Sequence, residues 1–185
     1  MIEDDELIRK FKDGDETGFD ELVRRYQQRV HSLLYRLVRN TEDARDLAQD
    51  VFVRAFRALP GFQGKSSFYT WLYRIAVNCA FNLMRSRGRQ KAKAGSEIQL
   101  NEEAMLNLPS SETPQSDFHR SELRRAIATA VETLPERQQA VFVMRQYEGM
   151  SNNEIAEVLG LSAGAVKSHY FFAVHKLQVA LKEWV

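Results

Sequence analysis

The clearest potential for chemistry lies in an aromatic and basic segment that runs from Phe62 to Arg74. Five of its thirteen residues are aromatic, and it contains no Asp or Glu. Aromatic rings stack on unpaired bases and cations neutralise phosphates, so this composition favours binding of a single nucleic-acid strand. The competing interpretation is that the rings fill a protein core, and for Phe68 or Trp71 alone the two interpretations are about equally good.

The helix predicted to continue from this segment adds polar groups of matching chemistry. At about 100° per residue, one of its faces lies about 120° from the apolar stripe formed by Leu72, Ile75, Cys79 and Leu83. That face carries Trp71, Arg74, Asn78, Asn82 and Arg85. Amide side chains hydrogen-bond base edges, and the guanidinium groups suit phosphates. The pattern therefore predicts a surface for unpaired nucleic acid.

A second DNA-binding pattern lies near the C-terminus. Ser151 and Glu154 have the spacing of a capping box, and Gly160 suits the left-handed turn that would end a short helix. Ser162 can cap a second helix, whose Val166 would pack inward. This order is typical of a helix-turn-helix, which places its second helix in the DNA major groove, and it outweighs an ordinary helical hairpin.

The outward side of that second helix carries residues suited to duplex DNA. Small residues allow close approach, lysine contacts phosphate or guanine, and serine contacts bases or phosphates. The residues predicted to face the duplex are Gly164, Lys167, Ser168 and Phe171.

The charges form blocks, although the net charge is only +1. Residues 61–93 contain seven Lys or Arg and no acid, and residues 94–117 contain five acids and no base. Adjacent blocks of opposite sign indicate partners for at least one of them, with solvated faces as the alternative.

The rest of the chain positions these motifs on helices. Apolar residues recur at helical spacing along residues 22–37, 44–59 and 123–134, and no strand or hairpin pattern is present. The periodicity fails over residues 88–117, which include two glycines and two prolines. We predict an all-α fold of two small helical domains, 1–87 and 118–185, joined by a flexible acidic linker at 88–117.

Several function classes are disfavoured. The acidic N-terminal segment lacks the apolar core of a signal peptide, and no apolar run is long enough to cross a bilayer, which predicts a cytoplasmic protein without membrane insertion. Cys79, the single cysteine, predicts a small buried apolar residue rather than a nucleophile. The histidines lack metal-ligand spacing, so we predict no metal, no cofactor and no catalytic site. An acidic cluster of Asp43, Asp46 and Asp50 is interpreted as a solvated or partner-binding face.

Four segments together resemble the sigma factors of bacterial RNA polymerase, in their extracytoplasmic-function (ECF) group. Residues 43–52 are similar to the polymerase-binding helix of that family, and residues 68–78 to its promoter-melting helix. Leu134-Pro135-Glu136-Arg137 and Val166-Lys167-Ser168 resemble landmarks of its region 4. The similarity extends over nearly the whole chain.

The resemblance implies partners and roles. The N-terminal domain, region 2, would bind the β′ clamp helices of core polymerase and capture the melted −10 element of the promoter. The C-terminal domain, region 4, would recognise the duplex −35 element and contact the β flap, and an anti-sigma factor would control the protein. The implied polymerase-binding residues are Asp43, Asp46, Gln49, Asp50 and Arg54. The implied −10 residues are Phe62, Lys65, Ser66, Trp71, Arg74, Asn78, Asn82 and Arg85.

One departure and one alternative stay open at this stage. Many relatives continue after Val166-Lys167-Ser168 with an arginine-rich run, whereas this chain has residues 169–175 with two adjacent phenylalanines. Fewer cations predict fewer phosphate contacts, and they leave the −35 sequence and the role of Phe172 open. The alternative is a repressor or response-regulator output module, which predicts a symmetric dimer on palindromic half-sites and does not explain residues 62–74.

Overall fold

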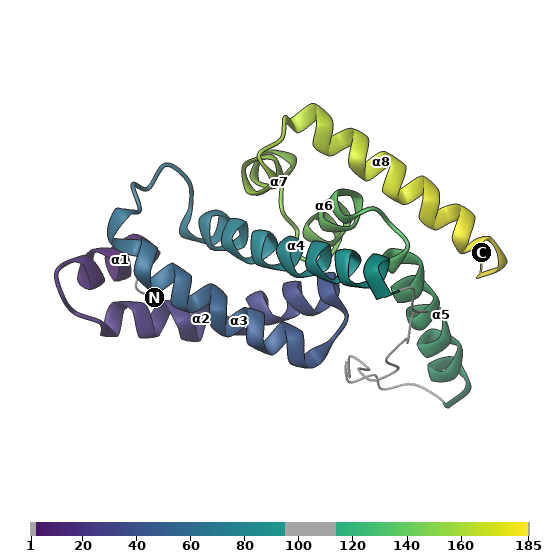
Figure 1. The fold of residues 1–185 in the computed structure, drawn as a ribbon, viewed down its shortest axis with the longest axis horizontal. Coiled ribbons are helices and arrows are strands. Elements are labelled where there is room, and N and C mark those ends of the chain that lie inside the picture. Colours follow the sequence, from purple (N-terminus) through teal and green to yellow (C-terminus); the bar gives the residue numbers. More distant parts are fainter. Residues whose placement is uncertain (1–2, 95–113, 185) are drawn as a thin grey trace.

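A computed structural model describes residues 3–94 and 114–184 of the chain, and these residues are helical apart from short turns. No strand occurs in the described ranges, and the helices form two domains with a C-terminal helix-turn-helix (Figure 1). The predicted all-α class is therefore confirmed. No helix in these ranges is long and apolar enough to cross a bilayer.

The N-terminal half consists of α1 (Asp4–Lys12), α2 (Thr17–Val38), α3 (Thr41–Ala58), the 3-10 turn η1 (Leu59–Gly61) and α4 (Phe68–Ala94). Helices α2, α3 and α4 pack on one another through the predicted apolar stripes, and α1 covers one end of α2. Gly18 allows that approach, because a Cβ there would lie 2.3 Å from the Leu7 carbonyl oxygen. These contacts hold α3 and α4, the two helices that carry most of the residues predicted to bind polymerase and the melted strand, in fixed positions.

The connection between α2 and α3 contains a residue with an unusual backbone conformation. Arg39 ends α2 with a left-handed φ of 54°, a conformation that glycine adopts more easily than arginine. Its Nε donates to Glu132 Oε1 at 2.8 Å, a contact with the other half of the chain. The next residue, Asn40, accepts the backbone N–H of Asp43 and so caps α3.

The C-terminal half consists of α5 (Pro114–Glu132), α6 (Glu136–Gln146), α7 (Asn152–Leu159), α8 (Ala163–Ala180) and the 3-10 turn η2 (Lys182–Trp184). The predicted local signals are all present around α7. Ser151 and Glu154 form a reciprocal capping box, and Gly160 ends the helix at a φ of 63°. Ser162 then caps α8 by accepting the N–H of Ala165 at 3.1 Å.

The flanking helices extend into the predicted linker, residues 88–117, from both ends. Helix α4 continues past Gly88 to Ala94, and α5 begins at Pro114, before residue 118. A single glycine costs a helix only about 1 kcal/mol, and the Arg, Gln, Lys and Ala residues after Gly88 favour helix. Residues 95–113 of the predicted linker lie outside the described residues.

The two halves pack against each other rather than standing apart. Helix α7 packs against α4, and α6 contacts α2 (Figure 1). The buried residues of both halves form one continuous apolar cluster. Buried polar contacts also cross the junction, and in one of them Gln139, only 2% exposed, donates to the carbonyl oxygen of Leu37 at 3.3 Å.

Candidate nucleic-acid and polymerase interfaces

The outward face of α4 carries most of the side chains predicted to bind a melted strand. Arg74, Asn78, Asn82 and Arg85 are exposed, whereas Trp71 is half-buried. The apolar stripe on the opposite side, represented by Leu72 and Cys79, is buried against the N-terminal core. Helical periodicity thus predicts the exposure of these four side chains, and their amide and guanidinium groups are open to a ligand.

The loop before α4 is less exposed than this face at one of its predicted strand-binding residues. Phe62 is only 8% exposed, and its ring lies 5.1 Å from Trp71 and 6.4 Å from Phe68 between centroids. For Phe62 and Phe68, the core interpretation of the aromatic residues describes the structure. Lys65 is exposed and Ser66 is half-buried, so of the loop residues predicted to bind the strand these two are accessible and Phe62 is not.

The loop is also tied to α1. Lys12 Nζ donates to the Phe62 carbonyl oxygen at 2.6 Å. At the other end of the loop, Ser67 caps α4 by accepting the N–H of Thr70 at 3.1 Å. Both ends of the loop are therefore held by hydrogen bonds, and Lys65 is presented from a defined position between them.

Two arginines of the α4 face contact the C-terminal half. Arg74 Nε donates to the carbonyl oxygen of Glu157, in α7, at 3.1 Å. Arg85 Nε lies 3.6 Å from Glu136 Oε2, at the start of α6. Both arginine side chains remain exposed, so these contacts are weak individually.

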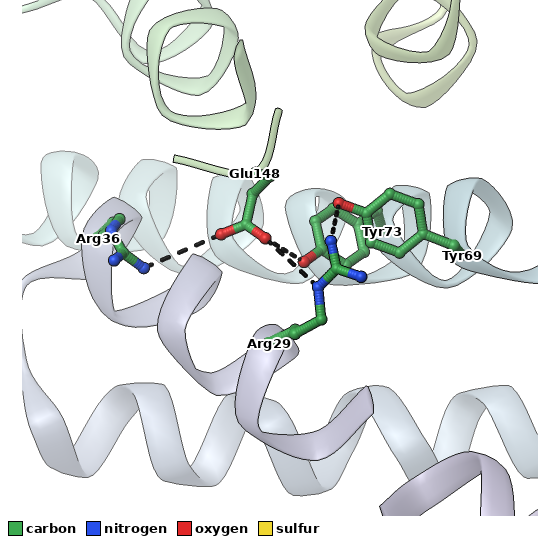
Figure 2. Close-up of polar contacts among 5 residues, drawn as sticks. All are labelled: Arg29, Arg36, Tyr69, Tyr73 and Glu148. Atoms are coloured by element: carbon green, nitrogen blue, oxygen red, sulfur yellow. Dashed lines mark hydrogen bonds and ion pairs between the residues drawn. The ribbon is translucent and has the colours of Figure 1, made fainter. Parts of the chain in front are cut away.

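A buried polar network beside this face was not anticipated from the sequence (Figure 2). Tyr73, which is fully buried, donates from Oη to Glu148 Oε2 at 2.6 Å. The Glu148 carboxylate also lies 3.9 Å from Arg29 Nε and 3.9 Å from Arg36 Nη1, and its side chain is only 6% exposed. Burial, and then the hydrogen bond to Glu148, raise the pKa of Tyr73, so its hydroxyl stays a neutral donor.

A second aromatic residue completes the network. The rings of Tyr69 and Tyr73 lie 4.1 Å apart between centroids, and Arg29 Nη2 donates to Tyr69 Oη at 3.1 Å. The sequence signal for this contact is a second stripe on α4, in which Tyr73, Val77 and Ala80 follow at helical spacing and are all buried. The N-terminal core already packs on the first stripe, so a second buried stripe indicates another covering element.

The predicted polymerase-binding residues divide into two groups. Asp46, Gln49, Asp50 and Arg54 are exposed along α3, and the Asp50 carboxylate pairs with Arg54 Nη2 at 2.9 Å. Asp43 points elsewhere, because its carboxylate lies 2.5 Å from Arg87 Nη2 of α4 and is only 19% exposed. Asp43 therefore joins α3 to α4, and the accessible face begins at Asp46.

A groove between α2 and α3 borders this acidic face. It has a volume of about 470 Å³ and combines apolar and polar walls. Its lining residues are Val23, Gln27, Gln28 and His31 from α2 with Arg45, Ala48, Gln49 and Phe52 from α3. The acidic pattern on α3 gives no signal for the contribution of α2, which depends on how the two helices pack.

The outward face of α8 presents the predicted duplex-binding residues. Gly164, Lys167 and Ser168 are exposed near the start of the helix, and Phe171 is 67% exposed. Ser168 Oγ donates to the Gly164 carbonyl oxygen at 3.2 Å. Phe172 is also exposed and meets Phe171 edge-on, with 5.6 Å between ring centroids. Val166 and Ala173, on the other side, are fully buried.

The structure offers little for metal or thiol chemistry. Within the described ranges, no three His, Cys, Asp or Glu residues are grouped so that they could hold a metal ion. Cys79 is buried, and this burial raises the pKa of its thiol and disfavours the nucleophilic thiolate. The accessible chemistry consists of basic, amide and acidic surfaces suited to macromolecular partners.

Comparison with known proteins agrees with this arrangement in both halves. Residues 22–90 match the family model of Sigma-70 region 2, and residues 124–177 match that of Sigma-70, region 4. The RNA polymerase sigma-H factor of Pseudomonas aeruginosa is 35% identical over 97% of this chain and 94% of its own length. The ECF RNA polymerase sigma-E factor of Escherichia coli K12 is 36% identical over 94% of this chain and 91% of its own.

A solved structure is similar over nearly the full length. CnrH, in complex with the cytosolic domain of CnrY, is 27% identical, covers 96% of each chain and superposes with a TM-score of 0.70. The two regions of one family match in chain order, over residues 22–90 and 124–177, and the sigma-H relative extends the similarity to 97% of this chain. The chain therefore belongs to the sigma-70 family of RNA polymerase sigma factors, in its ECF group.

Proposed function

We propose that this sigma factor directs core RNA polymerase to its promoters through the two surfaces described above. The outward face of α4, with Lys65 and Ser66, holds the melted −10 strand. The outward face of α8 binds the duplex −35 element. The observation that carries this assignment is the difference in chemistry between the two faces. Amide and guanidinium groups line α4, whereas small residues and Lys167 stand at the front of α8.

The exposed face of α3 is the proposed contact with the β′ clamp helices. Asp46, Gln49 and Asp50 are accessible there, beside a groove that α2 helps to form. Acidic residues at the rim would steer a basic partner, and the groove would accept its side chains. Asp43 acts inside the domain through Arg87 and supports this face indirectly.

We also propose control by an anti-sigma factor. CnrH, the solved relative described above, is bound to the cytosolic domain of CnrY. On this chain, exposed apolar side chains suitable for such a regulator include Phe171 and Phe172 on α8. Contact of a regulator with this surface would compete with duplex DNA.

The role needs no catalytic group in this chain, since the polymerase forms the RNA bonds. It also places the protein in the cytoplasm, where core polymerase and the chromosome are found. The 185 residues then act as a removable specificity subunit.

The direct test is transcription from genomic DNA by purified core polymerase with and without the protein. Sequencing of the 5′ ends should show new start sites that share two upstream motifs at fixed spacing. No new start sites would contradict the proposed function. Tight, sequence-specific binding of a dimer to palindromic duplex without polymerase would favour a repressor instead.

A further inference from the structure

Phe172 is an exposed aromatic residue that lies outside the set predicted to bind the duplex. The residue is 52% exposed, and its ring meets the ring of Phe171 edge-on. This arrangement is favoured between aromatic rings, so the contact limits the motion of the Phe172 side chain. A large apolar side chain that is held in a defined orientation at the surface indicates contact with a partner.

The position of Phe172 on α8 continues the proposed duplex surface. Gly164, Ser168 and Phe172 follow one another at four-residue spacing and are all exposed, whereas Val166 and Ala173 are buried on the other side. Side chains four residues apart lie above one another on one face of a helix. The Phe172 ring is about 6 Å further along the helix axis than Ser168. Base pairs are stacked about 3.4 Å apart, so the ring would meet a different base pair from Ser168.

The chemistry of this part of α8 restricts what the ring can recognise. Residues 168–175 contain no Asp, Glu, Lys or Arg, and α8 as a whole carries two lysines and no acid. A phenylalanine ring lacks the donors and acceptors that bind phosphates or the polar edges of bases. The apolar group that a base presents in the major groove is the C5-methyl group of thymine. Thymine is therefore the base that a ring at this position can distinguish.

We propose that Phe172 is a specificity-determining residue, which recognises a thymine of the −35 element by contact with its C5-methyl group. The inference rests on the proposed role of α8 in binding the −35 duplex. It assigns to one side chain a preference that the polar groups of Lys167 and Ser168 do not supply. It also predicts that the −35 motif shared by the start sites contains at least one thymine, on either strand.

The probe is deoxyuridine, which differs from thymidine only by the absence of this methyl group. Each −35 thymine of a promoter identified by start-site sequencing is replaced in turn by deoxyuridine. The modified and unmodified duplexes then compete for the holoenzyme. Base pairing and the polar edges of the base are unchanged by the replacement, so the ratio of the two affinities reports contact with the methyl group alone.

Three single variants of the full chain are compared with the wild type in the holoenzyme. Phe172→Ala removes the ring, and Phe172→Arg replaces it with a long cation. Val179→Ala is the matched control, because Val179 is 65% exposed and lies two turns further along nearly the same face. These positions are exposed, so the fold should survive, and circular dichroism verifies that each variant keeps its helices.

Burial of one methyl group is worth about four-fold in affinity. Deoxyuridine at one −35 position should therefore weaken binding of the wild-type holoenzyme about four-fold, and the Val179→Ala holoenzyme should show the same loss. For Phe172→Ala and Phe172→Arg, the two duplexes should bind with about equal affinity. Phe172→Arg should also steepen the salt dependence of binding, by about 0.9 in the logarithmic slope for one added phosphate contact.

The proposed recognition of thymine would be overturned if deoxyuridine had no effect at any −35 position of the wild type. An undiminished four-fold effect in Phe172→Ala would overturn it too, and would assign the ring to a protein partner instead. Equal loss of the preference in Val179→Ala would show a general effect of α8. Failure of the proposed function has a separate signature, because binding would then be independent of the whole −35 sequence and no new start sites would arise.

Discussion

The two proposed DNA surfaces, on α4 and on α8, differ in how accessible they are. The front of α8 is open, with Lys167 and Ser168 exposed, and the helix packs mainly on α6 and α7 of its own half. The face of α4 is contacted by the other half through Arg74 and Arg85, beside the buried Tyr73–Glu148 pair. The α8 front therefore has no competing contact at Lys167 and Ser168, whereas a strand on α4 would share Arg74 and Arg85 with the C-terminal half.

The largest expected effect concerns the protein with and without core polymerase. We expect each surface alone to bury less than the roughly 1,000 Å² of a strong specific DNA interface. When polymerase holds both at a fixed spacing, the second contact becomes effectively intramolecular, which adds about a hundred-fold or more to the affinity. Fluorescence anisotropy with promoter duplex should show this gain. A nanomolar, sequence-specific complex of the free protein with promoter duplex would contradict this expectation.

Reversal of one charge on α3 should weaken binding to core polymerase, and this loss should affect the use of both DNA surfaces equally. Asp50→Arg places like charges at the proposed polymerase contact, which costs several kcal/mol at a complementary interface. Folding should change by no more than about 1 kcal/mol, since the Asp50–Arg54 pair is exposed. We expect about a hundred-fold weaker binding to core polymerase in a competition assay.

The control for Asp50→Arg is Asp5→Arg, a reversal at an exposed acid of α1. It should leave polymerase binding within about two-fold of the wild type, because α1 lies outside the proposed contact. Equal effects of the two variants, or none from Asp50→Arg, would show that the α3 face is assigned wrongly.

A substitution on α8 should break one surface and spare the other. Lys167→Ala removes a proposed contact to base or phosphate, worth about 1–3 kcal/mol, so affinity for the −35 duplex should fall tens-fold within the holoenzyme. Lys176→Ala is the matched control, because that exposed lysine points about 180° away on the same helix. If both variants lose the same affinity, the effect is general electrostatics rather than recognition.

A smaller effect is expected at α7, which supports α8 and packs on α4. Ser151→Ala removes the N-cap of the capping box and should lower the free energy of unfolding by about 1 kcal/mol in urea titrations. The hydrogen bonds from Ser151 lower the pKa of Glu154, so this contribution is complete above the unfolded value of 4.5. It is lost as the pH falls through the lower, folded pKa.

Glu154→Gln should accordingly reduce the difference in stability between pH 7 and pH 3, compared with the wild type. The substitution keeps a side chain that can still accept the Ser151 N–H, so the helix start is preserved. An unchanged pH dependence would show that the capping box is not formed by an ionised Glu154 in solution.

Local sequence signals predicted the local structure well. The capping box at Ser151, the left-handed turn at Gly160 and the exposed face of Asn78 and Asn82 depend on residues a few positions apart. Such contacts are determined by helix periodicity and capping chemistry. They require no knowledge of how distant segments pack.

Tertiary contacts could not be predicted in the same way. Tyr73 and Glu148 are 75 positions apart, and nothing near either residue identifies its partner. Asp43 shares a helix with Asp50 but pairs with Arg87 of another helix. Phe62 lies in a loop whose composition favours base binding, yet the rings of two aromatic neighbours pack against it. In each case a neighbour that is distant in sequence determines the role.

We infer that α4 binds a strand only after the duplex has separated, whereas α8 binds intact duplex. Permanganate footprinting of thymines, with holoenzyme on closed and on pre-melted templates, distinguishes these two modes of binding. Asn78→Ala and Asn82→Ala keep or raise helix propensity at exposed positions, so the fold should survive. We predict that both variants bind the −35 duplex normally, open the closed template slowly and recover most of their activity on the pre-melted template. Equal failure on both templates would contradict it, and would show that these asparagines act in folding or in polymerase binding.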